Sequence, residues 1–270
     1  MVKKDEIVLK SGETAPDPWI KLRAFTEARI ALGRAGVAIP VGETLSFRLS
    51  HARARDAVHT KFEAGSVAKA ISKLGTDTVL VESAARDRAE YLTRPDLGGQ
   101  LSYRSAELLE NLHFPGCDLA IVVGDGLSSL AIHKNAVPFL EKFIPLCRKA
   151  GIGIGPVCVS SQSRVALGDA VGQRLKARVV AILIGERPGL SSPDSMGVYM
   201  TYHPVEGTTN EARNCISNIR DAGLLPELAV VKLTYLLGES LTKKLSGVNL
   251  KDEQPENYLP FSNLAGYIGS

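Results

Sequence analysis

Short apolar stretches alternate with longer helical patterns over most of the chain after residue 75. The apolar stretches are largely continuous and rich in β-branched residues, and they cover residues 78–81, 119–123, 152–159 and 178–184. Continuous apolar sequence is typical of parallel strands that are covered on both faces. Helical patterns lie between them at 105–112, 129–150 and 166–176. This alternation favours right-handed βαβ units, so we predict an α/β fold: an open, mostly parallel sheet with helices on both faces.

The flanking segments complete the predicted organisation. Residues 197–202 indicate a further strand, and helices are predicted over 210–221 and 226–245. Upstream, Asp17 and Pro18 begin a predicted helix whose apolar residues recur at helical spacing until Gly33 and Gly36, and a second helix is predicted over 44–62. We therefore divide the chain into an N-terminal tail (1–17), a small helical N-terminal region (18–70), an α/β domain (71–250) and a C-terminal tail (251–270).

The C-terminal tail is rich in proline and aromatic residues, among them Tyr258, Phe261 and Tyr267. Two interpretations stay open. The tail is either a loosely docked or disordered end, as chain termini commonly are, or a strap laid onto a partner subunit, because exposed aromatic residues are enriched at interfaces.

Composition and charge exclude several classes of protein. The 32 basic and 29 acidic residues give a net charge of +3, which is too small to demand a nucleic-acid or anionic-membrane partner. The longest strongly apolar run, 179–184, is far shorter than a membrane span. Acidic residues stand where a signal peptide would have its apolar core, and the four cysteines form no C-x-x-C pair. We therefore expect a cytoplasmic protein without a zinc site.

Two glycine-containing motifs follow predicted strands. The first, at 124–129, places Asp125 and Gly126 between a strand and a helix, where free backbone N–H groups can meet a ligand. The alternative is an ordinary turn in which Ser128 or Ser129 only caps the helix. The second, at 185–190, holds Glu186 in a loop shaped by proline and glycine. Glu186 either accepts hydrogen bonds from a ligand rich in N–H donors or pairs with neighbouring residues.

A basic run, with Arg48, His51, Arg53 and Arg55, lies on the second predicted helix. It is typical of a solvated face or a salt-bridged interface, and a nucleic-acid surface would need more basic charge overall. We expect this helix to face a protein partner. The sequence contains no G-x-S-x-G serine, P-loop or H-E-x-x-H motif, so we predict no catalytic residues and no metal site in this chain.

Six segments, taken in order, resemble the small (light) subunit of ethanolamine ammonia-lyase. They lie at 17–36, 51–58, 91–98, 125–128, 185–190 and 215–219, and together they span the chain from about 17 to 250. The resemblance implies a non-catalytic subunit of an adenosylcobalamin-dependent lyase that converts ethanolamine to acetaldehyde and ammonia. It also implies a hetero-oligomer in which a large barrel subunit performs the radical chemistry.

The resemblance further implies that Val165, Glu186 and Cys215 contact the cobalamin. Corrin carboxamides need acceptors such as the Glu186 carboxylate, and the apolar corrin face suits Val165. Cys215 is expected on a helix, as a packing or hydrogen-bonding neighbour. The chain has no D-x-H-x-x-G motif to supply a histidine ligand to cobalt. Location inside a bacterial microcompartment is an alternative to the free cytoplasm.

Two other functions stay open from the residues alone. One is a stand-alone α/β protein that binds a nucleotide or anion at the Asp125-Gly126 turn. The other is a structural module whose basic helix and aromatic tail only join partners. Binding experiments distinguish the three functions. The lyase subunit should bind its cofactor only with a large partner, the stand-alone protein should bind a nucleotide by itself, and the structural module should bind neither.

Overall fold

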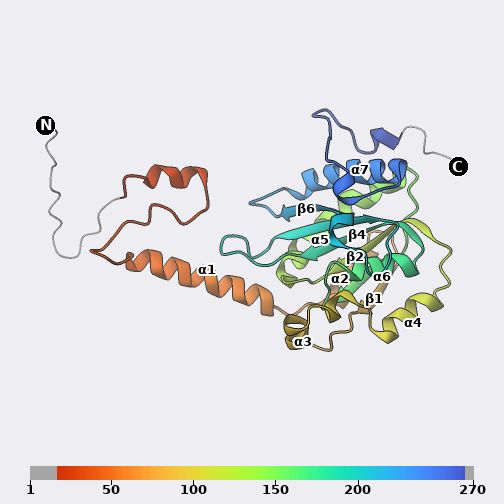
Figure 1. Cartoon of the computed structure of the whole chain (residues 1–270), viewed down its shortest axis with the longest axis horizontal. Helices are drawn as coiled ribbons and strands as arrows, with labels where there is room; N and C mark the ends of the chain where they lie inside the picture. Colours follow the sequence, from red (N-terminus) through yellow and green to blue (C-terminus); the bar gives the residue numbers. More distant parts are fainter. Residues whose placement is uncertain (1–16, 265–270) are drawn as a thin grey trace. The chain divides into compact units, whose positions relative to one another are not determined.

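A six-stranded sheet forms the core of the larger part of the chain in the computed structural model, which describes residues 17–264 (Figure 1). Residues 1–16 and the last six of the predicted C-terminal tail lie outside the described part. The strands are β1 (Thr78–Glu82), β2 (Cys117–Gly124), β3 (Val157–Ser161), β4 (Ala177–Gly185), β5 (Met196–Tyr202) and β6 (Arg213–Ile219). Their order is β1-β3-β2-β4-β5-β6. The first four are parallel to one another, and β5 alone runs antiparallel to its neighbours β4 and β6, which confirms the predicted α/β fold with a mostly parallel sheet.

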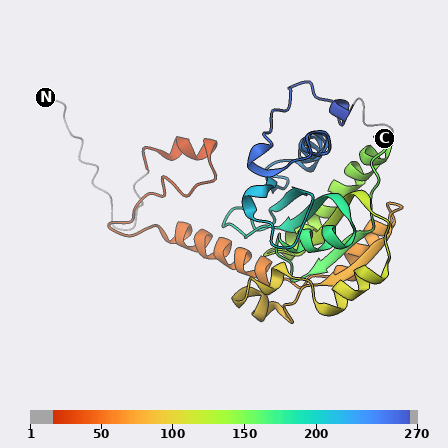
Figure 2. The same cartoon turned by 45° about the vertical axis from the view of Figure 1, so that its right-hand side comes forward.

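Helices cover both faces of the sheet. Successive side chains of its central strands point to opposite faces, and the apolar side chains on both faces are buried. Leu119, Ile121 and Val123 of β2 join one buried cluster with α2 (Ala64–Ser72), α5 (Ser129–Lys149) and α7 (Pro226–Lys243). The intervening Ala120 and Val122 join a second cluster with α4 (Tyr103–Asn111) and α6 (Leu167–Arg174). Figure 2 shows α7, in blue, nearly end-on beside the sheet. The helices α4, α5, α6 and α7 lie where the sequence predicted them, while α2 and α3 (Arg88–Thr93) were not predicted.

The predicted helix over 210–221 is wrong, because this segment contains β6. Its buried residues Arg213, Ile216 and Ile219 are spaced by three, which imitates a helical face. In the sheet, Ile216 is opposite Val198 and Ile219 is opposite Met196, so β6 has one extra residue between these pairs. Such a bulge turns residues three apart toward the same side.

The predicted first helix is also mostly wrong. Only a 3-10 helix, η1 (Ile20–Phe25), forms, and Thr26 is already extended. None of the η1 residues is buried, so no packing supports a longer helix. The second predicted helix is confirmed as α1 (Val41–His59), displaced by three residues toward the N-terminus at both ends.

The described part of the chain separates into two compact units, one with residues 17–55 and Gly189–Ser192 and the other with the rest. In the first unit, no residue from 17 to 55 is buried. In the second, Phe261 and Leu264 are buried in the cluster that includes α7, and the Tyr258 ring meets Tyr235 edge-on at 5.3 Å between centroids. The domain boundaries and the role of the C-terminal tail toward a partner stay predictions. No helix in the described residues is long and apolar enough to cross a membrane.

Candidate functional site

The carboxyl ends of β2 and β4 interlock through backbone atoms. The turn after β2 packs against the end of β4, where the Leu127 amide donates a hydrogen bond to the Gly185 carbonyl at 2.9 Å. Gly126 has a φ of 56°, and a side chain there would overlap the Gly185 carbonyl oxygen. Only glycine fits this close left-handed turn. Ser128 accepts a hydrogen bond from the Ala131 amide and caps α5, which confirms the capping role considered for this serine.

A cavity of about 380 Å³ opens at this edge of the sheet. Val165 and Glu186 both line it, although they follow different strands, β3 and β4. Its remaining walls come from Tyr91, Gly126, Leu127, Arg164, Ile184, Gly185, Arg187 and Tyr199. In open α/β sheets, ligands bind at the carboxyl ends of the strands, so this cavity is the candidate site.

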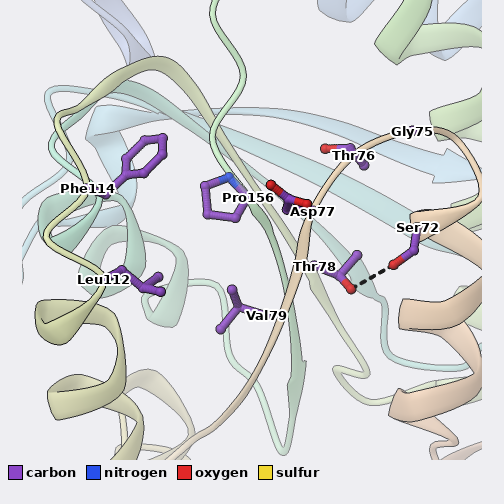
Figure 3. Close-up of a pocket in the computed structure, with 9 residues that line it drawn as sticks. All are labelled: Ser72, Gly75, Thr76, Asp77, Thr78, Val79, Leu112, Phe114 and Pro156. Carbon is purple, nitrogen blue, oxygen red and sulfur yellow. Dashed lines mark hydrogen bonds between the residues drawn. The ribbon is translucent and has the colours of Figure 1, made fainter.

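A second cavity, of about 690 Å³, lies at the opposite edge (Figure 3). It surrounds the start of β1 and contains one carboxylate, Asp77, together with the hydrogen-bonded hydroxyls of Ser72 and Thr78, 2.9 Å apart. None of the predicted site residues lines it. This larger cavity lies at the amino ends of the strands, whereas ligands of open α/β sheets bind at the carboxyl ends. The smaller cavity is therefore the better candidate.

Glu186 connects three strands through its carboxylate. Its Oε2 accepts from the Ser195 hydroxyl at 2.5 Å and the Asn218 amide at 3.2 Å, and its Oε1 accepts from the Ser217 hydroxyl at 2.5 Å. A carboxylate offers about four acceptor positions. One acceptor position on Oε1 therefore remains for a ligand. Glu186 thus links neighbouring segments of the sheet and can still accept the hydrogen bond predicted from the cobalamin.

Cys215 lies on β6 and is exposed, so its expected place on a helix is wrong. It is opposite Tyr199 in the β5–β6 ladder. Burial raises the pKa of Tyr199, which keeps this phenol protonated. Cys215 does not line the cavity itself but borders it through Tyr199.

Comparison with known proteins decides the family. The family model of the ethanolamine ammonia-lyase light chain matches residues 16–251. The chain belongs to this family. An ethanolamine ammonia-lyase small subunit from Xanthomonas campestris pv. campestris is 53% identical over 248 residues, covering 90% of this chain and 91% of that protein. The small subunit from Pseudomonas putida is 47% identical over 260 residues, with 95% and 96% covered.

In this light chain, the Asp125 carboxylate is committed to internal partners. It is 2% exposed, accepts from the Ser163 amide at 2.9 Å and lies 3.3 Å from Nη1 of Arg88. Burial raises the pKa of Asp125, while these bonds act in the opposite direction. With Asp125 paired, Ser128 capping α5 and Leu127 bonded to Gly185, the turn offers few free groups to a nucleotide.

A stacked arrangement of side chains beside the turn is not among the features predicted from the sequence. The guanidiniums of Arg88 and Arg164 both lie over the Tyr91 ring, with their Cζ atoms 4.7 and 4.4 Å from its centroid. Tyr91 donates to the Ser163 carbonyl at 3.0 Å. Arg164 lines the cavity, and its Nε is buried without a hydrogen-bond partner. Among residues 17–264, no group of three or more histidine, cysteine or acidic side chains could hold a metal ion.

Proposed function

We propose that this chain is the small subunit of an adenosylcobalamin-dependent ethanolamine ammonia-lyase and helps hold the cofactor against a large catalytic subunit. The observation that carries the proposal is the meeting of Val165 and Glu186 in one cavity at the carboxyl edge of the sheet, with Cys215 beside it. The relatives' shared name supports the activity and implies a larger partner.

The residues of the cavity suit the rim of a corrin. Corrin carboxamides present both N–H donors and carbonyl acceptors. Oε1 of Glu186 retains an acceptor position, and Arg164 and Arg187 supply donors on the same wall. Val165 offers an apolar contact. These side chains bind and orient the cofactor's edge.

The size of the cavity indicates a shared site. Drug-sized ligands fill pockets of roughly 300–1,000 Å³, and cobalamin is far larger than such ligands. A cavity of about 380 Å³ can therefore hold only part of it. The large subunit would cover the remainder, so a complete site needs the hetero-oligomer.

Adenosylcobalamin, when bound, supplies the radical chemistry that converts ethanolamine to acetaldehyde and ammonia. This chain contributes binding and orientation, and we assign the reacting groups to the large subunit. We place the complex in the cytoplasm, with a bacterial microcompartment as the alternative, and expect no nucleic-acid or membrane partner.

The test compares the chain alone with the chain co-expressed with its large subunit. We expect a coloured complex that retains cobalamin through gel filtration, and no retention by the chain alone. Nucleotide binding by the chain alone, without cobalamin in the complex, would instead support the stand-alone α/β nucleotide- or anion-binding protein.

A further inference from the structure

The segment from residue 17 to residue 55, here called the N-terminal segment, buries none of its side chains. Twenty large apolar residues are exposed in the described chain, and ten of them lie in this segment. They are Trp19, Ile20, Leu22, Phe25, Val37, Ile39, Val41, Leu45, Phe47 and Leu49. Exposed apolar side chains at this density mark an interaction surface.

Polar contacts within the segment give it a defined shape without burying these residues. Arg23 pairs with Glu43 on α1 at 2.7 Å, and its Nε donates to the Ile30 carbonyl at 2.9 Å. The Arg29 guanidinium lies 5.4 Å from the centre of the Phe47 ring. The loop is thus held on the helix through its cations, while its apolar side chains stay available for a partner.

One face of α1 concentrates the apolar surface. Val41, Leu45 and Leu49 follow one another at a spacing of four and are 73%, 57% and 52% exposed. This spacing places them on one side of the helix. Arg48 is exposed next to this stripe. An apolar stripe with a basic margin fits a partner surface with an apolar centre and an acidic margin.

The charge of the segment argues against a second copy of this chain as the occupant. Residues 17–55 contain seven basic and three acidic residues, a net charge of +4, while the whole chain carries only +3. Two such segments facing each other would bring like charges together, which opposes association.

We propose that the N-terminal segment is a docking surface for the large subunit, with the Val41–Leu45–Leu49 stripe of α1 at its centre. This inference rests on the proposed function, since the partner is the large subunit implied there. The complementary surface on that subunit is apolar and bordered by carboxylates.

The test uses the full chain with the double substitution Leu45→Glu/Leu49→Glu. A matched control, Leu80→Glu/Leu228→Glu, changes two leucines of similar exposure, 51% and 54%, in the other unit. Affinity for the purified large subunit is measured by titration, and folding by thermal unfolding. We expect the α1 variant to bind at least about tenfold more weakly, the control to bind like the wild type, and neither to change the unfolding temperature of the α/β unit appreciably.

The outcomes separate this inference from the proposed function. If the wild-type chain does not bind the large subunit, the proposed function fails. If the wild type binds and the α1 variant binds equally well, only the docking inference fails. Two other results would overturn the inference while subunit affinity is unchanged. If the α1 substitutions abolish self-association of the wild type, the occupant is a second copy of the chain. If they abolish retention on anionic lipid vesicles, the occupant is a membrane surface.

Discussion

The Glu186 carboxylate has both internal partners and a free acceptor position, so its structural contribution can be tested separately from the proposed contact with the cofactor. Glu186→Gln removes the charge and places an amide donor against the donors of Ser195, Ser217 or Asn218. A hydrogen bond to a charged group contributes roughly 1.5–3 kcal/mol. We expect the unfolding free energy of the chain to fall by about this amount in denaturant titrations.

The cofactor role of Glu186 is tested in the assembled complex. If Oε1 also accepts a corrin amide, Glu186→Gln should weaken cobalamin binding by roughly ten- to hundred-fold. Ser217→Ala is the control, since it removes one internal donor to the same oxygen and leaves the carboxylate. Equal cobalamin affinity in wild-type and fully assembled Glu186→Gln complexes would reject the ligand role.

His133 gives the chain a local sensitivity to pH. Its Nε2 accepts from the Glu63 amide at 3.2 Å, and its ring stacks on Phe62. Burial lowers the pKa of His133 below its ordinary value of 6.5. The unfolded chain therefore binds this proton more readily, and stability is lost as pH falls through about 6.5. Thermal unfolding between pH 7.5 and 5.5 checks this expectation.

His133→Phe is the matched control, because phenylalanine can stack on Phe62 but cannot titrate. The unfolding temperature of this variant should depend less on pH than that of the wild type, while the other histidines contribute equally to both. Identical pH profiles for the two proteins would contradict the assignment.

At the scale of elements, Asp169 of α6 and Arg213 of β6 form a buried ion pair, with side chains 2% and 3% exposed. Removing one partner of such a pair typically costs about 3–5 kcal/mol. We expect Arg213→Met to lose stability in this range. The double variant Asp169→Leu/Arg213→Met should recover much of it, because no buried charge is left unpaired. A double variant as unstable as the sum of the single changes would contradict this account.

The turn after β2 permits a similarly controlled substitution. Gly126→Ala meets both a left-handed φ and the Gly185 carbonyl, whereas Gly151→Ala meets only a left-handed φ of 73° with open space around it. Gly151→Ala should cost about 1 kcal/mol, and Gly126→Ala clearly more. Denaturant titration of both variants measures the difference, and equal losses would show that the turn can relax.

Strand prediction succeeded where local sequence decides the structure. The continuous apolar stretches of β2 and β4 are buried on both faces, so their pattern could be interpreted without knowing their neighbours. It failed at β6, where the bulge opposite β5 produces a helical spacing. The missed α3 did carry a local signal, since Asp87 caps it by accepting from the Glu90 amide, three residues on.

The candidate site divides in the same way. Topology predicts that residues after β3 and β4 meet, and Val165 and Glu186 do line one cavity. The stack of Arg88, Tyr91 and Arg164 could not be predicted, because it joins residues more than 70 positions apart through side-chain orientation alone.

For the whole molecule, the chain should be inactive by itself. The cavity of about 380 Å³ is too small for a whole cobalamin, and the proposed function assigns the rest of the site and the reacting groups to the large subunit. We expect no deamination of ethanolamine by the rigorously purified chain with adenosylcobalamin added, and activity when the large subunit is supplied. Acetaldehyde formation by the chain alone, measured in a coupled assay, would contradict the proposal that the large subunit holds the reacting groups.

The interlocked backbone of Gly126 and Gly185 has a consequence for how such a site can diverge. A cavity floor made of main-chain atoms keeps its shape when the surrounding side chains are exchanged. The walls, formed by Arg164, Val165 and Arg187, can then adapt to a changing partner one substitution at a time. Evolutionary drift would therefore change the affinity for a ligand before it changes how deeply the ligand is bound.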